Sequence, residues 1–461
     1  MFDFDRDDPN RKREWITAYH DGVLLDRLTF GEALERADAL RAALYERGLQ
    51  AGDRVIVALD NSPQAVIAYL AISRADMVSV PVSPRESDRV LAFVRGHSAA
   101  RAIISDVGIT KLDRSLFDHP AIPSDALTIV YTSGTTGEPK GVVQGLFQWR
   151  ANSEALIDHH HVDPDTVLAS PLPLYHCNAH GLAMLTTWHA RARYVLFNRA
   201  TDDMLNRVNR EDVHILSIVP AILFNLIKSR PDWRPHAGFR YVLTAAAALS
   251  PALLQSVLDT WHVRVIQGYG LSESVNFSCT LPIDLSDDLY HAVMFPYPSV
   301  GVALPGVAIR VGDNDEEGEI GELSIFSPAN MIGYWRQPSH DKAWIESGDV
   351  GYYKIFDGVP FYYLTGRIKE QINRGGETIS PIAVEDELRA AGVTAEIAVV
   401  GYPDDALGEE IGLISLEPIP DGILQSIRNS RRPKRVAIVQ EIPRTSTGKV
   451  KRKQAAELLT W

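Results

Sequence analysis

The sequence contains little cysteine, no long apolar run and no excess of positive charge. Cys177 and Cys279 are the only cysteines among 461 residues. Two thiols do not make a disulfide framework, so we expect a reducing compartment and a cytoplasmic protein. No uninterrupted apolar stretch reaches the roughly 20 residues of a membrane-spanning helix, and the acidic N-terminus lacks the apolar core of a signal peptide. The formal net charge of −13 argues against nucleic-acid binding, so an anionic ligand would need local positive groups.

Repeats and low-complexity segments are also missing, and what remains is an alternation of two patterns. Apolar runs such as 54–59 and 127–131 have the length of buried strands, and between several such runs apolar residues recur at helical spacing, as in 32–47. This alternation predicts an α/β fold with layered, mainly parallel sheets and helices. After about residue 301, shorter and turn-rich segments predict a β-rich subdomain. So long a chain is expected to form at least two domains.

Residues 131–140, with the sequence YTSGTTGEPK, carry the strongest local signal. The two glycines permit close backbone approach, while hydroxyl and N–H groups can wrap a polyphosphate and Lys140 adds positive charge. The order Gly-Lys-Ser/Thr of a Walker A loop is missing, and a flexible surface loop is the alternative interpretation. The candidate phosphate-binding residues are Thr132, Ser133, Gly134, Thr135, Thr136, Gly137 and Lys140.

Taken as a whole, this run resembles the signature of the adenylate-forming superfamily, which comprises acyl-CoA synthetases, amino-acid adenylation domains of peptide synthetases and beetle luciferases. Four more segments resemble that family's motifs, in the family's order. They are QGYGLSE at 267–273, the pair SGD at 347–349 and TGR at 365–367, the run 366–381, and PRTSTGKVKR at 443–452. The first 130 residues resemble the family only in their general sequence pattern, without a specific motif. Residues 175–181 resemble the medium and short acyl-CoA synthetases more than the luciferases, and the chain as a whole most resembles stand-alone acyl-CoA synthetases.

The resemblance implies roles for the nucleotide-binding residues. Tyr269 would stack on adenine, Ser272 would bond the α-phosphate in place of the family's usual Thr, and Glu273 would be a catalytic residue that binds Mg²⁺. Asp349 would accept hydrogen bonds from the ribose hydroxyls and Arg367 would donate. Gly268, Gly270 and Ala246 belong to the same implied ATP site, and Thr136 to the metal site. Taken alone, each of these short motifs would be interpreted as a turn.

The same resemblance divides the chain into a large N-terminal adenylation domain, residues 1–367, and a small mobile α+β domain, residues 368–461. Lys369 would be the hinge, and Gly375 with Gly376 would line the passage for a thiol. Lys449 would be catalytic, because a fixed cation can stabilise the charge that builds between carboxylate and α-phosphate. The alternative for this segment is a solvated basic tail. Solvation is the expectation for Lys451, Arg452 and Lys453.

The implied acyl pocket lies among three segments, 171–181, 219–222 and 244–248, with His176, Ala245 and Ala247 as lining residues. Peptide-synthetase domains place an Asp near position 176, so His176 speaks against an amino-acid substrate, although a purely structural histidine is equally compatible. The small residues could leave room for a bulky acyl group. Arg191, Arg193 or Arg199 could pair with a second carboxylate. The tract His159–His161 lacks ligand partners at useful spacing and is interpreted as a solvated helix end.

The predicted function is therefore ATP-dependent activation of a carboxylic acid to acyl-AMP, with Mg²⁺, followed by thioester formation with coenzyme A. One alternative is an adenylating enzyme that loads a carrier protein, which would have to be a separate chain because no carrier segment follows Trp461. A second alternative is a non-catalytic nucleotide-binding protein of the same fold. The sequence leaves open the acid, the acceptor and the choice between monomer and homodimer.

Overall fold

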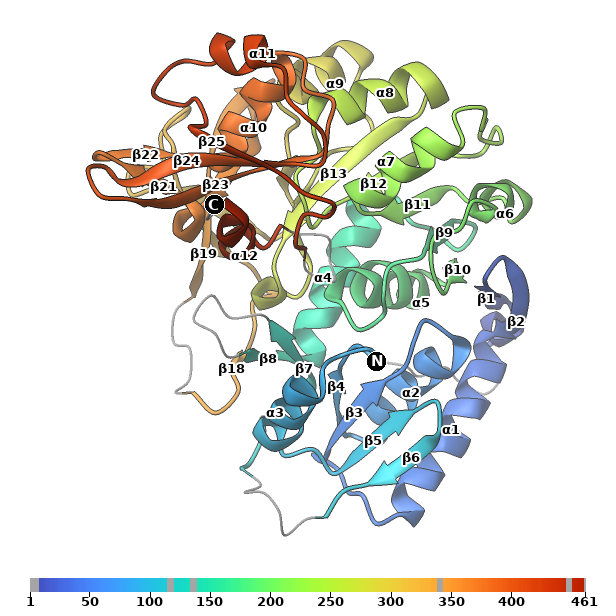
Figure 1. The fold of residues 1–461 in the computed structure, drawn as a ribbon. Coiled ribbons are helices and arrows are strands. Elements are labelled where there is room, and N and C mark those ends of the chain that lie inside the picture. Colours follow the sequence, from blue (N-terminus) through green and yellow to red (C-terminus); the bar gives the residue numbers. More distant parts are fainter. Residues whose placement is uncertain (1–7, 114–119, 133–138, 338–342, 445–449, 460–461) are drawn as a thin grey trace.

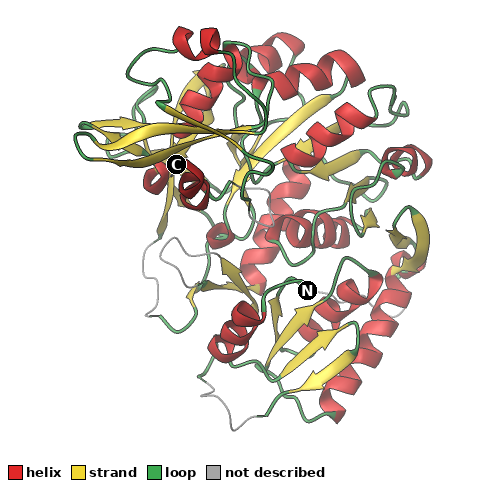
Figure 2. Ribbon diagram, in the orientation of Figure 1, coloured by secondary structure: helices red, strands yellow, loops and turns green. Residues whose placement is uncertain are grey.

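The structure is a computed structural model that describes residues 8–113, 120–132, 139–337, 343–444 and 450–459. Four sheets organise the chain, with nine, seven, four and five strands. The seven-stranded sheet forms the lower part of Figure 1, the nine-stranded sheet crosses the centre and right, and the C-terminal sheet lies at the upper left. Helices pack around the parallel strands of the central part (Figure 2). The predicted α/β fold with layered, mainly parallel sheets is confirmed.

The seven-stranded sheet has the order β18-β8-β7-β4-β3-β5-β6. Its strands are β3 Arg54–Ala58, β4 Val78–Pro81, β5 Ala102–Ser105, β6 Gly108–Lys111, β7 Ala126–Thr132, β8 Lys140–Gly145 and β18 Gly333–Tyr334. The helices that precede or cover it are η1 Pro9–Lys12, α1 Phe30–Glu46, α2 Pro63–Arg74 and α3 Asp88–Ser98. Helix α2 begins where the sequence predicts, because the Ser62 hydroxyl accepts a hydrogen bond from Ala65 N and Pro63 occupies the first turn.

The nine-stranded sheet has the order β15-β14-β13-β12-β11-β9-β10-β1-β2. Its strands are β1 Glu14–His20, β2 Val23–Thr29, β9 Val167–Ser170, β10 Arg193–Phe197, β11 Ile215–Ile218, β12 Tyr241–Thr244, β13 Arg264–Gly270, β14 Phe277–Thr280 and β15 Val302–Ala303. The associated helices are α4 Leu146–His159, the π-helix η3 Asn178–Leu185, α5 Thr186–Ala190, α6 Met204–Arg210, α7 Pro220–Ser229, α8 Pro251–Trp261, η4 Ser272–Ser274 and α9 Asp287–Met294. Strands β1, β10, β9, β11, β12 and β13 run parallel. Fully buried tryptophans, Trp15, Trp149, Trp188 and Trp261, anchor the core of this sheet.

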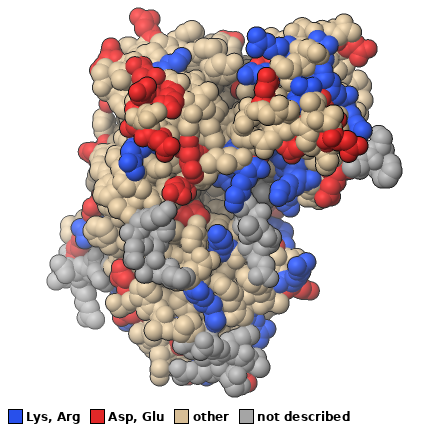
Figure 3. All heavy atoms as spheres, turned by 90° about the vertical axis from the view of Figure 1, so that its left-hand side faces the viewer, with Lys and Arg blue, Asp and Glu red and all other residues tan. Residues whose placement is uncertain are grey.

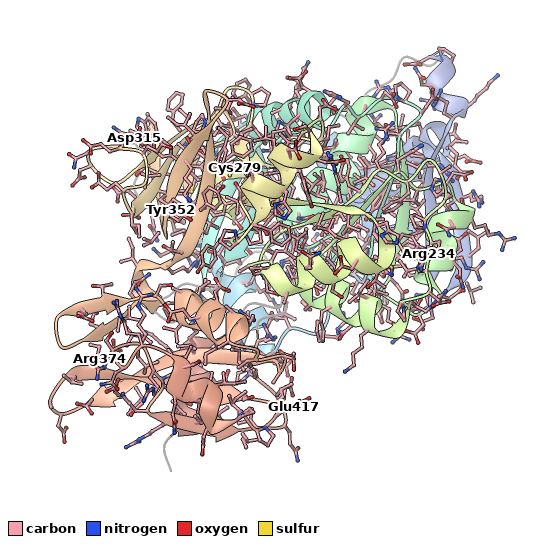
Figure 4. The ribbon with its side chains drawn as sticks, turned by 90° about the horizontal axis from the view of Figure 1, so that it is seen from above. Arg234, Cys279, Asp315, Tyr352, Arg374 and Glu417 are labelled. Carbon is pink, nitrogen blue, oxygen red and sulfur yellow. The ribbon has the colours of Figure 1, made fainter. Side chains whose placement is uncertain are left out.

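Two antiparallel or mixed sheets follow along the chain. The four-stranded sheet consists of β16 Ala308–Val311, β17 Gly321–Phe326, β19 Trp344–Phe356 and β20 Val359–Arg367. The C-terminal part contains η5 Ile368–Glu370, β21 Ile372–Arg374, β22 Glu377–Ile379, α10 Pro381–Ala390, β23 Ile397–Asp404, β24 Gly408–Ser415, α11 Asp421–Ser426, β25 Arg435–Ile438, α12 Arg452–Ala456 and η6 Glu457–Leu459. Two hydrophobic clusters of this part contain only residues from 372 onward. Seen from above, the body that carries Arg374 and Glu417 lies beside the sheet that carries Tyr352 (Figure 4).

Two expectations about local structure are wrong. The apolar run 263–266 predicts a strand that ends before the motif 267–273, yet β13 continues to Gly270. This is possible because a Cβ on Gly270 would lie 1.7 Å from Asn276 O, so only glycine lets β14 approach here. The expectation of a solvated tract at His159–His161 is wrong for His160, which is 1% exposed and whose Nδ1 lies 2.9 Å from the Tyr241 hydroxyl, whereas His161 is exposed as expected. Among the described helices, none combines the length and apolar character needed to cross a membrane.

Candidate active site

The parallel strands of the nine-stranded sheet bring the predicted site segments to one edge. Strands β9, β11, β12 and β13 are paired in parallel, so their carboxyl ends lie at the same edge. The segments that leave this edge are 171–181 after β9, 219–222 after β11 and 245–248 after β12, and the motif 267–273 ends β13. Ligands of parallel α/β sheets bind at the carboxyl edge of the strands. The topology therefore gathers segments that are far apart in the sequence.

Three of the side chains predicted to bind the nucleoside form a hydrogen-bonded group. Asp349 on β19 and Arg367 on β20 are directly opposite in the antiparallel register. Arg367 Nε donates to Asp349 Oδ1 at 2.7 Å, and the Tyr269 hydroxyl donates to Asp349 Oδ2 at 2.8 Å. Asp349 is only 6% exposed. The carboxylate is thus held in one orientation by two donors before any ligand is bound.

The electrostatics of this group follow from its burial. Burial alone would lower the pKa of Arg367, but the Asp349 carboxylate beside it raises that pKa above its ordinary value. Burial and the same carboxylate both raise the pKa of Tyr269. Tyr269 is therefore neutral and Arg367 charged throughout the ordinary pH range. A neutral ring suits stacking against an adenine base, and a fixed cation suits a ribose or phosphate oxygen.

The phosphate end of the site starts at the base of the loop predicted to bind phosphate. Thr132 at the end of β7 and Lys140 at the start of β8 are paired in register, so they close the loop between them. The Lys140 ammonium lies 4.9 Å from the centroid of the Tyr334 ring, and the Tyr334 hydroxyl donates to Glu273 Oε1 at 2.9 Å. Tyr334 thus connects Lys140, at the base of the loop, with Glu273, the predicted metal-binding carboxylate. Ser133, Gly134, Thr135, Thr136 and Gly137 lie outside the described residues, as does Lys449.

Strand β8 also fixes the position of the predicted α-phosphate ligand. Gln144 is fully buried and its Nε2 donates to the Ser272 carbonyl at 2.6 Å. The Cys177 thiol lies 3.7 Å from the Ser272 hydroxyl. Burial raises the pKa of Cys177, although its bonds with Gln144 and Ser272 oppose this. Cys177 is therefore a protonated thiol that packs against the centre of the site, and its chemistry does not suit a nucleophile.

Two residues beside the site have unusual backbone conformations. Ala246 has φ of 69° although it carries a Cβ. Val275 has φ of 68° and ψ of −58°, and Asn276 N donates to Ser274 O at 2.8 Å, which together describe a γ-turn. Each such conformation costs on the order of 1–3 kcal/mol and is found mainly at functional sites. The strained positions flank the ends of β12 and β13, where the predicted ATP residues Ala246, Gly268 and Gly270 lie.

Glu273 has the chemistry that a magnesium site requires. Within the described parts of the chain, no three His, Cys, Asp or Glu side chains gather into a ready-made metal site. Mg²⁺ in nucleotide-dependent enzymes commonly takes one or two carboxylates and completes its shell with substrate phosphate and water. Glu273 accepts one hydrogen bond, from Tyr334 to Oε1, and its burial is intermediate. A single carboxylate next to a phosphate loop fits this pattern.

Tyr334 and Gln144 contact the predicted site residues, but the sequence analysis does not predict either of them. Tyr334 reaches the site because β18 pairs with β8, with Tyr334 opposite Val142. Its only sequence signal is the apolar segment around it, and nothing there indicates a partner nearly two hundred residues earlier. The sequence could have indicated Gln144, because alternate residues of a strand lie on one face of the sheet, which puts Gln144 on the same face as Lys140.

On the side of the site predicted to hold the acyl group, the side chains pack so closely that they leave no room for a water molecule between them. The residues that meet there are Pro81, Thr128, Val130, Trp149, Leu174, Tyr175, His176, Cys177 and His180. His176 is partly exposed, whereas His180 is 4% exposed and packs between the rings of Tyr69 and Trp149. Ala245 is buried and Ala247 is partly exposed. His180, a weaker candidate than His176 from the sequence, lies in the same closely packed group of side chains.

The three arginines considered for a second carboxylate have other partners. Arg193 pairs with Glu211 at 2.7 Å and Arg199 pairs with Asp21 at 2.6 Å. Arg191 Nη1 donates to the Trp188 carbonyl. The expectation that they serve a dicarboxylate substrate therefore finds no geometric support.

The buried histidine predicts acid sensitivity. Burial lowers the pKa of His180 from 6.5 to about 4, so the unfolded chain binds the extra proton first as the pH falls. The stability associated with His180 is complete above pH 6.5 and is lost progressively between 6.5 and 4. Between pH 7 and 5 we expect a loss of about 2 kcal/mol in the free energy of unfolding from this group. Denaturant unfolding of the wild type and His180→Gln at both pH values measures it; an equal pH effect in both proteins contradicts the assignment.

Tyr334→Phe tests the bridge between the loop base and Glu273. The substitution keeps the ring under Lys140 and removes only the hydroxyl that orients the carboxylate. We expect the Mg²⁺ concentration needed for half-maximal pyrophosphate release to rise about tenfold, the size typical of losing a hydrogen bond to a metal ligand. Tyr353→Phe is the matched control, because its hydroxyl donates to the Asp315 carbonyl in the β-rich sheet. An unchanged Mg²⁺ requirement in Tyr334→Phe would remove Tyr334 from the site.

In the C-terminal part, the predicted hinge and passage residues occupy irregular backbone. Lys369 lies in the short helix η5. Gly375 and Gly376 form the turn between β21 and β22 with φ of 57° and 88°, a region that favours glycine. Lys451 and Lys453 are exposed as expected. The expectation of a solvated Arg452 is wrong, because its side chain is only 12% exposed and pairs with Glu385.

Comparison with known proteins identifies the family. A family model described as AMP-binding enzyme matches residues 8–335, most of the chain. The chain belongs to this AMP-binding enzyme family. Because the match starts at residue 8, the first 130 residues share more with the family than a general sequence pattern.

Members of the AMP-binding family resemble this chain over nearly its whole length. A long-chain-fatty-acid–CoA ligase of Mycobacterium tuberculosis is 28% identical and the alignment covers 92% of each chain. A sulfoacetate–CoA ligase of Cupriavidus necator is 27% identical and the alignment covers 92% of this chain and 91% of that one.

Among solved structures, ATP-bound MatB from Rhodopseudomonas palustris aligns with a TM-score of 0.83 at 24% identity, over 98% of this chain and 97% of that chain. Apo MatB aligns with a TM-score of 0.74 at 25% identity, over 97% and 96%. Both solved structures therefore share the fold of this chain over nearly its whole length.

Proposed function

We propose that this protein is an AMP-forming acid–thiol ligase that activates a carboxylic acid with ATP and transfers the acyl group to coenzyme A. The observation that carries the proposal is the convergence of two pre-formed groups. Asp349, Arg367 and Tyr269 form one hydrogen-bonded group, which we assign to the nucleoside, and Lys140, Tyr334 and Glu273 form a second, which we assign to the phosphates. Only two residues separate Tyr269 from Ser272, which suits a nucleotide lying across both groups.

The first step forms the acyl-adenylate. A carboxylate oxygen of the acid attacks the α-phosphorus of ATP, the bond to the β-phosphate oxygen breaks, and pyrophosphate leaves with the electron pair. We assign the Ser272 hydroxyl to the α-phosphate and Lys140 to the outer phosphates, which is supported by the bond from Gln144 to the Ser272 carbonyl and by the position of Lys140 at the base of the loop. Mg²⁺ at Glu273 would supply charge neutralisation for the phosphates. Lys449 would add a cation at the reacting oxygens.

The second step transfers the acyl group. The coenzyme A sulfur attacks the carbonyl carbon of the acyl-adenylate, the bond to the phosphate oxygen breaks, AMP leaves with the electron pair, and the thiol proton passes to solvent. We assign residues 1–367 and 368–461 to two domains that move about Lys369 between the steps. The C-terminal part has hydrophobic clusters of its own, as an independently moving body requires. Gly375 and Gly376 would face the thiol in the second arrangement.

The charge distribution supports an anionic ligand despite the net charge of −13. On the face shown in Figure 3, Lys and Arg gather at the upper right and below the centre, whereas Asp and Glu gather at the upper left and reach the centre. Local clusters of basic side chains on an acidic protein attract polyphosphate ligands. The relatives are described as CoA ligases of chemically different acids, so the acceptor is the shared feature and the acid must be found by assay.

The proposal is tested by ATP-dependent pyrophosphate release over a panel of aliphatic, aromatic, dicarboxylic and amino acids, each with and without coenzyme A. Hydroxylamine traps any acyl-adenylate. We expect release with one class of acid, and a thioester when coenzyme A is present. Release that ignores coenzyme A would point instead to a carrier-protein loader. No release with any acid, together with tight ATP binding in a titration, would favour a non-catalytic nucleotide-binding protein.

A further inference from the structure

Arg452 forms a buried ion-pair network that joins three segments of the C-terminal part. Its Nε donates to Glu370 Oε2 at 3.1 Å, and its Nη1 donates to Glu385 Oε1 and to the Val399 carbonyl, both at 2.5 Å. The side chains of Arg452 and Glu385 are 12% and 8% exposed, and that of Glu370 is 34% exposed. Burial alone would raise the pKa of Glu385, but Arg452 holds it below its ordinary value. The pair is therefore ionised, and one guanidinium serves a strand, a helix and the segment after Lys369.

The network stands at the base of the segment that carries Lys449. Arg444 and Val450 form a β-bridge, and Lys451 N donates to the Pro443 carbonyl at 2.8 Å, so both ends of 445–449 are held together. Arg444 in turn pairs with Glu396 at 2.5 Å. Arg452 follows this base directly, and its partner Glu370 follows Lys369 directly. The Arg452 side chain thus connects the segment after Lys369 with the segment after Val450, and in the proposed movement these two segments would have to move together.

We propose that Arg452 is a positioning residue that fastens Glu370 to the body of the C-terminal domain and so confines the pivot to Lys369. The inference rests on the domain movement of the proposed function. Without the contact, the backbone beyond Lys369 could rotate separately from the domain, and residues 450–452 would lose their fixed distance from the pivot. Arginine is suited to this role because its fork binds two carboxylates and a carbonyl at once, whereas lysine is a single point charge.

Two variants separate this role from simple stabilisation. Glu370→Ala removes only the partly exposed, hinge side of the network and leaves the buried Arg452–Glu385 pair intact. Arg452→Lys keeps a charge for Glu385 but loses the fork. Glu387→Ala is the matched control, because Glu387 pairs with Arg431 at 2.5 Å from the same helix, with a side chain 29% exposed, and does not contact the hinge.

For Glu370→Ala we expect the rate of acyl-adenylate formation at saturating substrates to fall about tenfold, as for a small misplacement of a reacting group. The KM for ATP should stay within about twofold of wild type, since the nucleotide site belongs to the large domain. In the Arg452→Lys background, Glu370→Ala should have almost no further effect. Fully multiplicative losses in the double variant, or an equal loss in Glu387→Ala, would overturn the proposal.

Amide hydrogen exchange of residues 368–374 supplies a readout that needs no turnover. Arg452→Lys should accelerate exchange in this segment about fivefold, as a local opening would, while Glu387→Ala leaves it at the wild-type rate. If Arg452→Lys exchanges faster but the wild type releases no pyrophosphate, the role of the network is supported and the ligase function is rejected. An active wild type whose variants change neither exchange nor rate would keep the function and reject the network.

Discussion

Lys449→Ala is expected to abolish acyl-adenylate formation while leaving thioester formation from preformed acyl-adenylate close to the wild-type rate. A cation placed in a water-poor site stabilises the charge that builds between the carboxylate and the α-phosphate, and removing one such group costs about 10²–10³-fold or more in rate. The second step needs no such cation, because AMP leaves without a new phosphorus bond. Pre-steady-state measurement of the two half-reactions, the second with synthetic acyl-adenylate, separates them.

Lys453→Ala is the control for Lys449→Ala. Lys453 is exposed on α12, four residues beyond Lys449. Its substitution by alanine therefore removes the same charge from the same basic segment. Both half-reactions should keep their wild-type rates in this variant. Equal loss of both half-reactions in Lys449→Ala would contradict the alternation of domains, because one lysine would then serve both arrangements.

Asp349→Asn is expected to raise the KM for ATP about tenfold, the size of one lost charge-assisted hydrogen bond. The variant keeps the shape of the side chain but removes the charge that Arg367 and Tyr269 both bind. Arg367 then faces a neutral amide. Because its side chain is 39% exposed, water offsets part of the loss, and the free energy of unfolding should fall by only about 1 kcal/mol. Pyrophosphate release at varied ATP and thermal unfolding measure the two effects.

Asp357→Asn on the same hairpin is the control for Asp349→Asn. Asp357 is exposed in the turn between β19 and β20. Its substitution by asparagine therefore removes an equal charge from the same hairpin, at a distance from the group of Asp349, Arg367 and Tyr269. A KM for ATP that rises equally in both variants would mean that Asp349 acts only through the general field of the protein. An unchanged KM in Asp349→Asn would place the nucleoside elsewhere.

The sequence predicts the layout of the site better than its supporting contacts. The apolar runs separated by helical patterns predict the parallel strands between β9 and β13, although not their order in the sheet, and the motif order singles out Asp349 and Arg367, which the structure brings together. Tyr334 is missed because it enters through the pairing of β18 with β8, a contact between distant segments that no local pattern encodes. Arg452 is misjudged because a basic run normally lies in solvent, and only tertiary structure supplies Glu370 and Glu385.

The extent of β13 is a second case in which tertiary structure decides. Its apolar run ends at Ile266, yet pairing with β14 extends the strand through Gly270, because glycines at 268 and 270 permit the close approach. His160 shows the converse, since the burial of one histidine in a polar tract depends on Tyr241 from another strand. Placement of neighbours, rather than propensity, fixes both outcomes.

Isotope transfer tests the central claim most directly. The acid that supports turnover is prepared with ¹⁸O in its carboxylate, and the phosphate products are analysed by mass spectrometry after a complete reaction with ATP and coenzyme A. Attack of the carboxylate on the α-phosphorus predicts AMP that carries one ¹⁸O atom and pyrophosphate that carries none. Appearance of the label in orthophosphate, or AMP without label, would contradict an acyl-adenylate intermediate and with it the assignment of this site.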